Sequence, residues 1–148
     1  SRLAQQTYPG ALPSFVSLND PWWVSATLNN PGHSAVGLGN DEEAIAYFCQ
    51  AISKALQVGA LPVAMEAMAG IAAPLLPRWG AERVMELLGL VFHHPGSDNE
   101  AKTKGLPIYE QLLAEMPDDV AQRALARGKR LPLNVLVDHV LREGEQVI

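Results

Sequence analysis

The feature that most constrains the fold of this chain is a set of small residues with one aromatic residue among them. Gly32 and Ala44 are followed by Phe48 and Ala51. Small residues let two helix backbones approach closely, and a large ring can fill the space beside them. The spacing predicts an antiparallel helical hairpin that runs from Trp22 to about residue 58.

A similar pattern returns about forty residues later. Gly70 follows Gly32, and the other positions are followed by Val84, Leu88 and Val91. A period of roughly forty residues with a helix-turn-helix in each unit is typical of helical repeats, which stack because no unit buries its apolar face alone. No segment has a convincing strand pattern. We therefore predict an all-α fold of stacked antiparallel helical hairpins, with about six to seven helices.

The composition restricts the classes of function. The net charge is −5 over 148 residues, whereas nucleic-acid-binding surfaces are normally basic. No apolar run reaches the roughly eighteen residues expected of a membrane span. The single cysteine, Cys49, has no partner for an internal disulfide and lies in an apolar stripe, which favours a buried structural thiol. We expect a cytoplasmic protein that contacts neither nucleic acid nor membrane directly.

Start and stop signals suggest how the chain is divided. Proline and glycine interrupt a helical pattern in residues 1–20, so this segment is interpreted as the broken remnant of a preceding repeat. The sequence also begins without methionine, and we expect it to be an excised piece of a longer protein. Asp20 and Pro21 then give an N-cap and a first helical position for a repeat domain over residues 21–145.

Three further boundaries are predicted within that domain. Residues 62–76 are apolar nearly all round and indicate a central buried helix, which Pro74 and Pro77 are expected to end. Ser97 and Glu100 have the spacing of a capping box. A one-sided apolar stripe after residue 132 predicts a final helix that caps the stack.

The order of these tracts resembles a known family. Residues 19–22 and 28–44 resemble a tetratricopeptide repeat, and the tracts at 58–70, 88–95 and 117–133 continue in an order similar to the C-terminal end of bacterial STAND-type signal-transduction ATPases. Those regulators join an effector domain, a nucleotide-binding switch and a tail of tetratricopeptide repeats. The similarity covers about residues 19–145. It implies a tetratricopeptide-like α–α superhelix that belongs to a transcriptional or signalling regulator.

The chain departs from that family pattern at several positions. Pro31, Gly105 and Pro107 fall where such a tail ordinarily keeps helix formers, so interruptions are expected in the first and fifth helices. The sequence also lacks a G-x-x-x-x-G-K-[ST] run, so the family's nucleotide hydrolysis is not carried over.

These observations favour a non-catalytic module that needs no cofactor. Its partner would be another protein, other domains of the parent chain or a small-molecule inducer. In a repeat stack the first helix of each hairpin forms the inner, concave wall, so the predicted binding residues are Asn29, His33, Ala67, Ile71 and the anchor Trp22. Asn29 and His33 suit either a hydrogen bond to an extended peptide or a place in the stack interface, and both interpretations stay open.

Two alternatives remain. A small metal-dependent enzyme would use His93 or His94 with Asp98 or Glu100, although adjacent histidines lack the usual i, i+4 ligand spacing and suit a helix C-terminus. A small-molecule site between hairpins would be lined by apolar side chains, namely Met65, Met68, Phe48 and Trp79. A basic cluster is interpreted as a solvated face or a contact with an acidic neighbouring domain; its members are Arg123, Arg127, Lys129 and Arg130.

Overall fold

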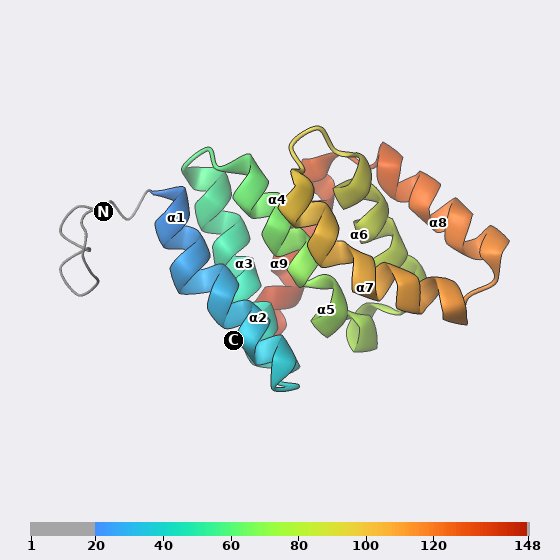
Figure 1. Cartoon of the computed structure of the whole chain (residues 1–148), viewed down its shortest axis with the longest axis horizontal. Helices are drawn as coiled ribbons and strands as arrows, with labels where there is room; N and C mark the ends of the chain where they lie inside the picture. The colour runs from blue at the N-terminus through green and yellow to red at the C-terminus, as the bar shows by residue number, and fades with distance from the viewer. Residues whose placement is uncertain (1–19, 148) are drawn as a thin grey trace.

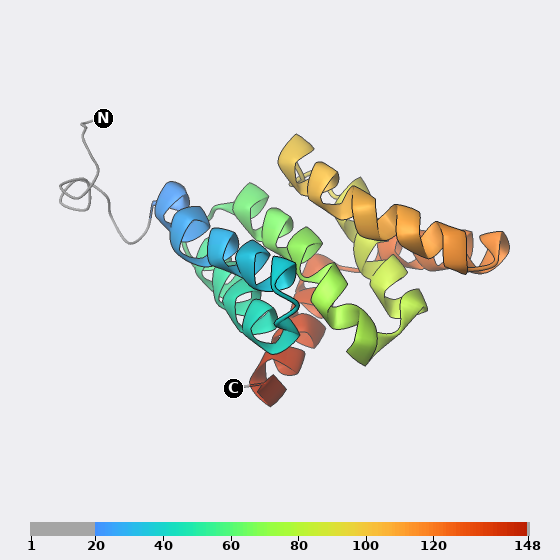
Figure 2. The same ribbon diagram turned by 60° about the horizontal axis from the view of Figure 1, so that its bottom comes forward.

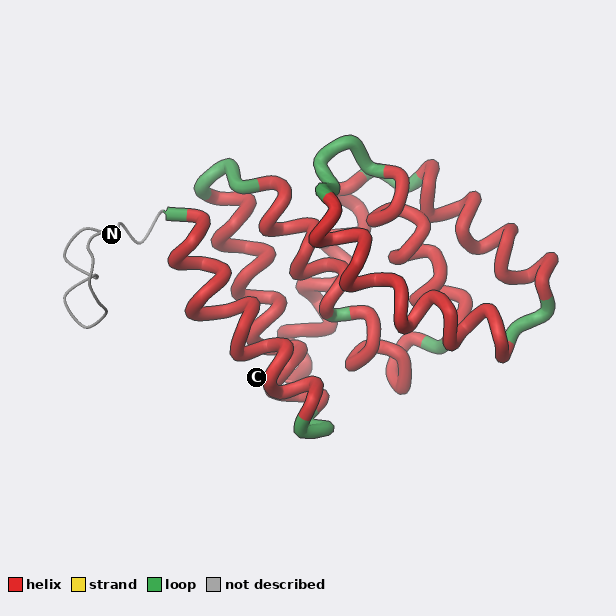
Figure 3. The backbone as a smooth tube through the Cα atoms, viewed as in Figure 1, coloured by secondary structure: helices red, strands yellow, loops and turns green. Residues whose placement is uncertain are grey.

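The computed structural model describes residues 20–147, and all regular structure in this range is helical (Figures 1 and 3). The elements are α1 (Pro21–Val24), the π-helical turn η2 (Ser25–Asn29), α2 (Asn30–Gly37), α3 (Asp41–Gln57), α4 (Leu61–Gly70), α5 (Ala72–Trp79), α6 (Ala81–His93), α7 (Asn99–Glu115), α8 (Asp118–Arg130) and α9 (Leu133–Val147). The all-α prediction is confirmed. With α1, η2 and α2 counted as one, this part of the chain has 8 helices, slightly more than predicted. The remnant predicted for residues 1–20 lies outside the described residues except for Asp20.

Successive helices pack as antiparallel pairs. The helix formed by α1, η2 and α2 packs on α3, the α4–α5 segment packs on α6, and α7 is followed by α8. The most extensive contacts between neighbouring pairs are those of α6 with α8, α3 with α4 and α4 with α7 (Figure 2). The first helices of the three pairs lie side by side, because η2 contacts α4 and α4 contacts α7.

Local signals set several helix boundaries. Asp20 caps α1 by accepting a hydrogen bond from the Trp22 amide, with Pro21 in the first position. Gly59 has a φ of 75°, a left-handed conformation that ends α3. The predicted capping box is wrong, because Asp98 rather than Ser97 caps α7 by accepting a 3.0 Å hydrogen bond from the Ala101 amide.

Proline interrupts the helices less than predicted. Ahead of Pro31 the first helix widens into the π-helical turn, in which the Asn30 amide bonds the Ser25 carbonyl five residues back. Proline lacks an amide hydrogen and crowds the carbonyl four residues earlier, so a wider turn accommodates it without a break. α7 is likewise continuous through Pro107, which corrects the expected interruption.

The end predicted for the central helix is also corrected. A single turn residue, Ile71, separates α4 from α5, and α5 continues through Pro74 and Pro77 to Trp79. Pro74 lies in the first turn of α5, where amide groups have no partner within the helix in any case.

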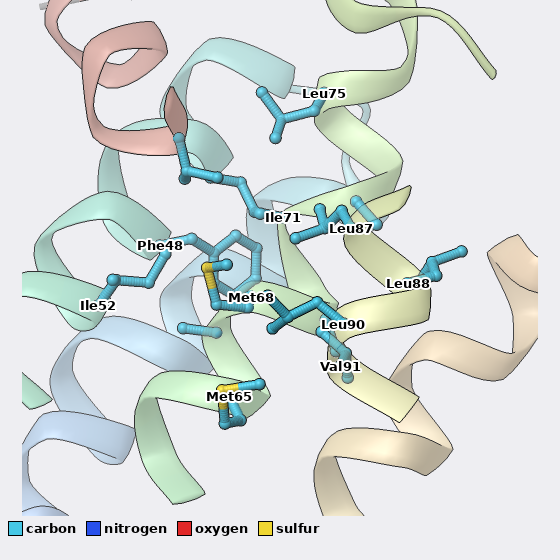
Figure 4. Close-up of a cluster of buried hydrophobic side chains, with 14 of the residues drawn as sticks. Phe48, Ile52, Met65, Met68, Ile71, Leu75, Leu87, Leu88, Leu90 and Val91 are labelled. Atoms are coloured by element: carbon cyan, nitrogen blue, oxygen red, sulfur yellow. The ribbon is translucent and has the colours of Figure 1, made fainter. Parts of the chain in front are cut away.

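One continuous core joins the first two hairpins (Figure 4). The Phe48 ring lies at its centre, where a β-carbon on Gly32 would come within 2.8 Å of the ring and one on Gly70 within 2.7 Å. The predicted role of these two glycines is therefore confirmed. Other fully buried side chains belong to the same core, namely Ile45, Ile52, Met65, Met68, Ile71, Leu75, Leu87 and Leu88.

The row of hairpins ends at α8, and the last helix, α9, returns to the first hairpin. α8 turns its buried residues toward α6, and its charged residues are exposed or half-buried, so α8 ends the row of hairpins with a polar outer face. The main packing partner of α9 is α3, in the first hairpin, and Figures 1 and 2 place the end of α9 beside that hairpin. The prediction that the final helix caps the stack is therefore corrected.

Candidate functional site

A groove of about 360 Å³ lies among the first helices of all three hairpins. Its floor is formed by Ala69 and Gly70 at the end of α4 and by Ala73 of α5. One wall comes from α2 and the other from α7; the wall residues are His33, Val36, Lys104, Pro107 and Ile108. We call this site the α2–α7 groove. It is open over a floor of small side chains, which allows close approach of a ligand backbone.

His33 is the most unusual residue of this groove. Its ring forms a T-shaped pair with the Phe48 ring, with centroids 4.9 Å apart and planes at 73°. Its Nε2 atom is buried and has no hydrogen-bond partner within residues 20–147. A buried polar atom without a partner is costly, and such atoms call for an explanation, either functional or an unseen water molecule.

Burial and a neighbouring charge favour the neutral form of the His33 imidazole. Burial lowers the pKa of its imidazole, the nearby Lys104 ammonium lowers it further, and the Glu66 carboxylate opposes them more weakly. The Lys104 Nζ atom donates a 2.9 Å hydrogen bond to Glu66 Oε2 at the rim of the groove. The ion pair therefore leaves the groove close to neutral overall.

The structure does not bring the five predicted binding residues together on one surface. Asn29, Ala67 and Ile71 are fully buried, and the Asn29 amide nitrogen donates to the Val63 carbonyl at 3.5 Å. Their place in the interior corrects the expectation that they face a ligand. Trp22 is 56% exposed at the start of the first helix and does not line the groove.

Of the five predicted binding residues, only His33 lines this groove. Lys104, Pro107 and Ile108 were not predicted as site residues, and neither were Val36, Ala69 and Ala73. A signal for α7 is present, since Gly105 follows Gly70 by thirty-five positions and repeats the Gly32 to Gly70 interval approximately.

The residues proposed for the two alternative sites make contacts within the chain or lie in its core. His93 Nδ1 lies 2.9 Å from the Gly89 carbonyl oxygen, and His94 Nδ1 accepts a hydrogen bond from the Gly96 amide. No cluster of three or more His, Cys, Asp or Glu side chains within residues 20–147 is arranged to hold a metal ion. The side chains proposed for a small-molecule site between hairpins are all buried in the core, namely Met65, Met68, Phe48 and Trp79.

Cys49 is buried as predicted, and its Sγ atom donates to the Val140 carbonyl of α9. Burial raises the pKa of the Cys49 thiol to about 12. In the basic cluster, Arg127 bonds Glu86 and Glu82 of α6, and Arg123 pairs with Asp119 one turn away. These interactions are structural contacts within the chain.

A second groove, of about 450 Å³, lies between α3 and α9, where its lining includes Gln50, Gln57 and Leu141. We place the candidate site in the α2–α7 groove because that groove joins three hairpins and contains the unpaired His33 nitrogen. None of the helices described in residues 20–147 combines the length and apolar character needed to cross a bilayer.

Fold and groove together define an all-α protein of packed helical hairpins with an open site on the face of the first helices. Comparisons of the chain with protein-family models, with curated proteins and with solved structures find no match.

Proposed function

We propose that this chain is a non-catalytic, tetratricopeptide-like helical-repeat module that binds a protein partner through the α2–α7 groove. The observation that carries the proposal is the position of that groove, which is lined by the first helices of three successive hairpins. A surface made by several repeats at once is the usual binding face of helical-repeat proteins.

The resemblance of residues 19–145 to the tail of STAND-type ATPases suggests the biological setting. In that setting the module is the C-terminal part of a cytoplasmic bacterial regulator and binds either a partner protein or the nucleotide-binding switch of its own parent chain. Affinity comes from apolar contacts more than from charge, because the Lys104–Glu66 pair is already satisfied.

Two measurements test the proposal. The first is the complete open reading frame, which should encode a phosphate-binding loop upstream of this segment. The second is calorimetric titration of the isolated chain with the remaining domains of the parent protein, produced separately. Saturable binding supports the module. An open reading frame with no upstream nucleotide-binding domain removes the regulator assignment, and absence of binding to any parent domain contradicts the intramolecular partner.

A further inference from the structure

The last helix packs far from its place in the chain. Only Leu131 and Pro132 separate α9 from α8, yet α8 packs on α6, whereas α3 is the one element within residues 20–147 on which α9 packs extensively. The thiol of Cys49 in α3 and the Val140 carbonyl of α9 meet across 91 positions. The attachment of α9 therefore depends on contacts that are remote in sequence and not on the helix that precedes it.

The surface that receives α9 makes specific demands on a helix. The residues of α9 that become buried are Leu136, Val137, Val140 and Gly144. A β-carbon at position 144 would come within 2.6 Å of Cys49 Sγ, so this position suits glycine. One residue earlier, Glu143 accepts 3.1 Å hydrogen bonds from Trp79 and Arg78. The α9 helix meets all these demands, and a second copy of the chain carries the same helix.

One side of α9 is open. Two grooves, of about 450 and 370 Å³, run along the contact between α3 and α9, and Leu141 lines both of them. Every lining residue of the two grooves belongs to α3 or α9, and Leu56 of α3 is 37% exposed there. On this side α9 can therefore leave α3 without displacing another helix.

The connection between α8 and α9 suits an exchange of helices. Leu131 has an extended backbone, with φ −72° and ψ 134°, as expected for a residue before proline. Since α9 has no extensive contact with α8 in the described part of the chain, the direction in which α9 leaves this connection does not affect how α8 packs on α6. Exchange of an identical element between copies is a low-cost route to a dimer, because the contacts formed are the same as those lost.

We propose that two copies of this chain form a dimer by exchanging α9, so that the α9 helix of each copy packs on α3 of the other. The dimer keeps the contact of Cys49 with Val140 and the hydrogen bonds of Glu143, now made between copies. Within one copy the short connection gives α9 a roughly millimolar effective concentration, so exchange competes when the chain folds at a comparable concentration. The surface involved shares no lining residue with the α2–α7 groove, and this inference does not depend on the proposed function.

The first test measures the mass of the complete chain by light scattering after refolding from urea at a series of concentrations. We expect less than about a tenth of the protein as dimer after refolding at about 10 µM and more than about half at about 1 mM.

The matched control for this series is Gly144→Cys, in which the new β-carbon would lie 3.0 Å from that of Cys49, close enough for a disulfide bond after a small shift. When oxidised in dilute solution, this variant holds α9 on its own α3. It should then remain monomeric at every refolding concentration and regain the behaviour of the wild type when reduced.

A second test locates the exchange. The wild type, which supplies Cys49, is refolded at about 1 mM with a double variant that combines Cys49→Ser and Gly144→Cys, and the mixture is oxidised once folded. Neither chain can form an internal disulfide bond, so a link between Cys49 and position 144 requires α9 of one copy to lie on α3 of the other. The control combines Cys49→Ser with His139→Cys, at an exposed position of α9, and should give no link to Cys49. Mass spectrometry identifies the linked peptides.

A third measurement needs no variant and decides the matter if circular dichroism shows that the Gly144→Cys chains are not folded. In dimers refolded from isotope-labelled and unlabelled wild type, isotope-filtered NOEs should connect Cys49 of one copy with Val140 of the other. A wild type that stays monomeric after refolding at about 1 mM overturns the proposal. Dimerisation of oxidised Gly144→Cys also overturns it, as does a wild-type dimer that shows neither the link nor the NOEs.

Discussion

A β-carbon on Gly128 would overlap the main-chain carbonyl of Glu86, because the backbones of α6 and α8 are in direct contact where they cross. The same crossing places Gly89 of α6 against the Leu125 carbonyl of α8. Neither backbone can move away without separating the two helices, since Ala124 and Leu125 are buried in the same interface. Arg127 also bonds Glu86 across it at 2.8 Å.

Replacement of Gly128 by alanine should therefore lower the free energy of unfolding by about 3 kcal/mol, near the upper end of the usual cost of overpacking. Urea unfolding followed by circular dichroism measures the change. The matched control is Gly37→Ala, where a new β-carbon meets no atom within 4 Å and alanine improves the helix propensity. Equal stability of Gly128→Ala and the wild type would contradict the close crossing.

The attachment of α9 depends on Glu143, which accepts 3.1 Å hydrogen bonds from Trp79 Nε1 and Arg78 Nη1. Glu143→Ala leaves the largely buried indole N–H without a partner and should destabilise the chain by about 1–2 kcal/mol. The same urea measurement checks this. Glu110→Ala, at an exposed position of α7, should change the stability by less than about 0.5 kcal/mol, and an equal effect of the two substitutions would refute a specific role for Glu143.

Acidification should destabilise the chain through His33. Its pKa is lowered in the folded state by burial and by Lys104, while the unfolded chain keeps the ordinary value of about 6.5. Below about pH 6.5 the unfolded state therefore binds more protons, and the free energy of unfolding falls until the folded pKa is passed.

Urea unfolding at about pH 7.5 and about pH 5 tests this expectation, because the pH dependence should be smaller in His33→Gln than in the wild type. The control His139→Gln removes an exposed histidine and should keep the wild-type dependence. Parallel profiles for His33→Gln and the wild type would count against the buried, neutral imidazole.

The Cys49 thiol should react very slowly with a disulfide reagent in the folded protein, because its pKa is raised to about 12 and α9 covers it. Gly144→Ala should increase the labelling rate, since a β-carbon there would come within 2.6 Å of Cys49 Sγ and displace α9. Absorbance of the released reagent gives the rate, with Gly37→Ala as the control. Fast labelling of the wild type would show that α9 does not protect this face.

Local signals in the sequence were sufficient for helix class and for several boundaries. Asp20 and Gly59 act through their own backbone surroundings, so each one predicts a helix end without knowledge of the fold. The interruption predicted at Gly105 was wrong because the role of this residue depends on the fold. Its low helix propensity is local, but its function is to receive the Phe92 ring, to which a β-carbon would come within 3.0 Å.

The candidate site was predicted only in part for a similar reason. The sequence pattern placed Asn29, His33, Ala67 and Ile71 on the first helices of two hairpins, but periodicity alone does not say which side of a helix is covered by its neighbours. Because α4 is enclosed by α3, α6 and α7, Ala67 and Ile71 lie in the core. Lys104 joins the groove through the packing of α7 on α4, which no local signal specifies.

The return of α9 to the first hairpin also affects how the chain gains and loses its structure. Cys49 and Val140 touch across 91 positions, so the outer side of α3 stays uncovered until residues 133–147 have left the ribosome. An open row of repeats can unfold from one end and refold one unit at a time. Here the last helix of the chain packs on the first hairpin, so we expect folding to be slower and melting to be a single concerted event.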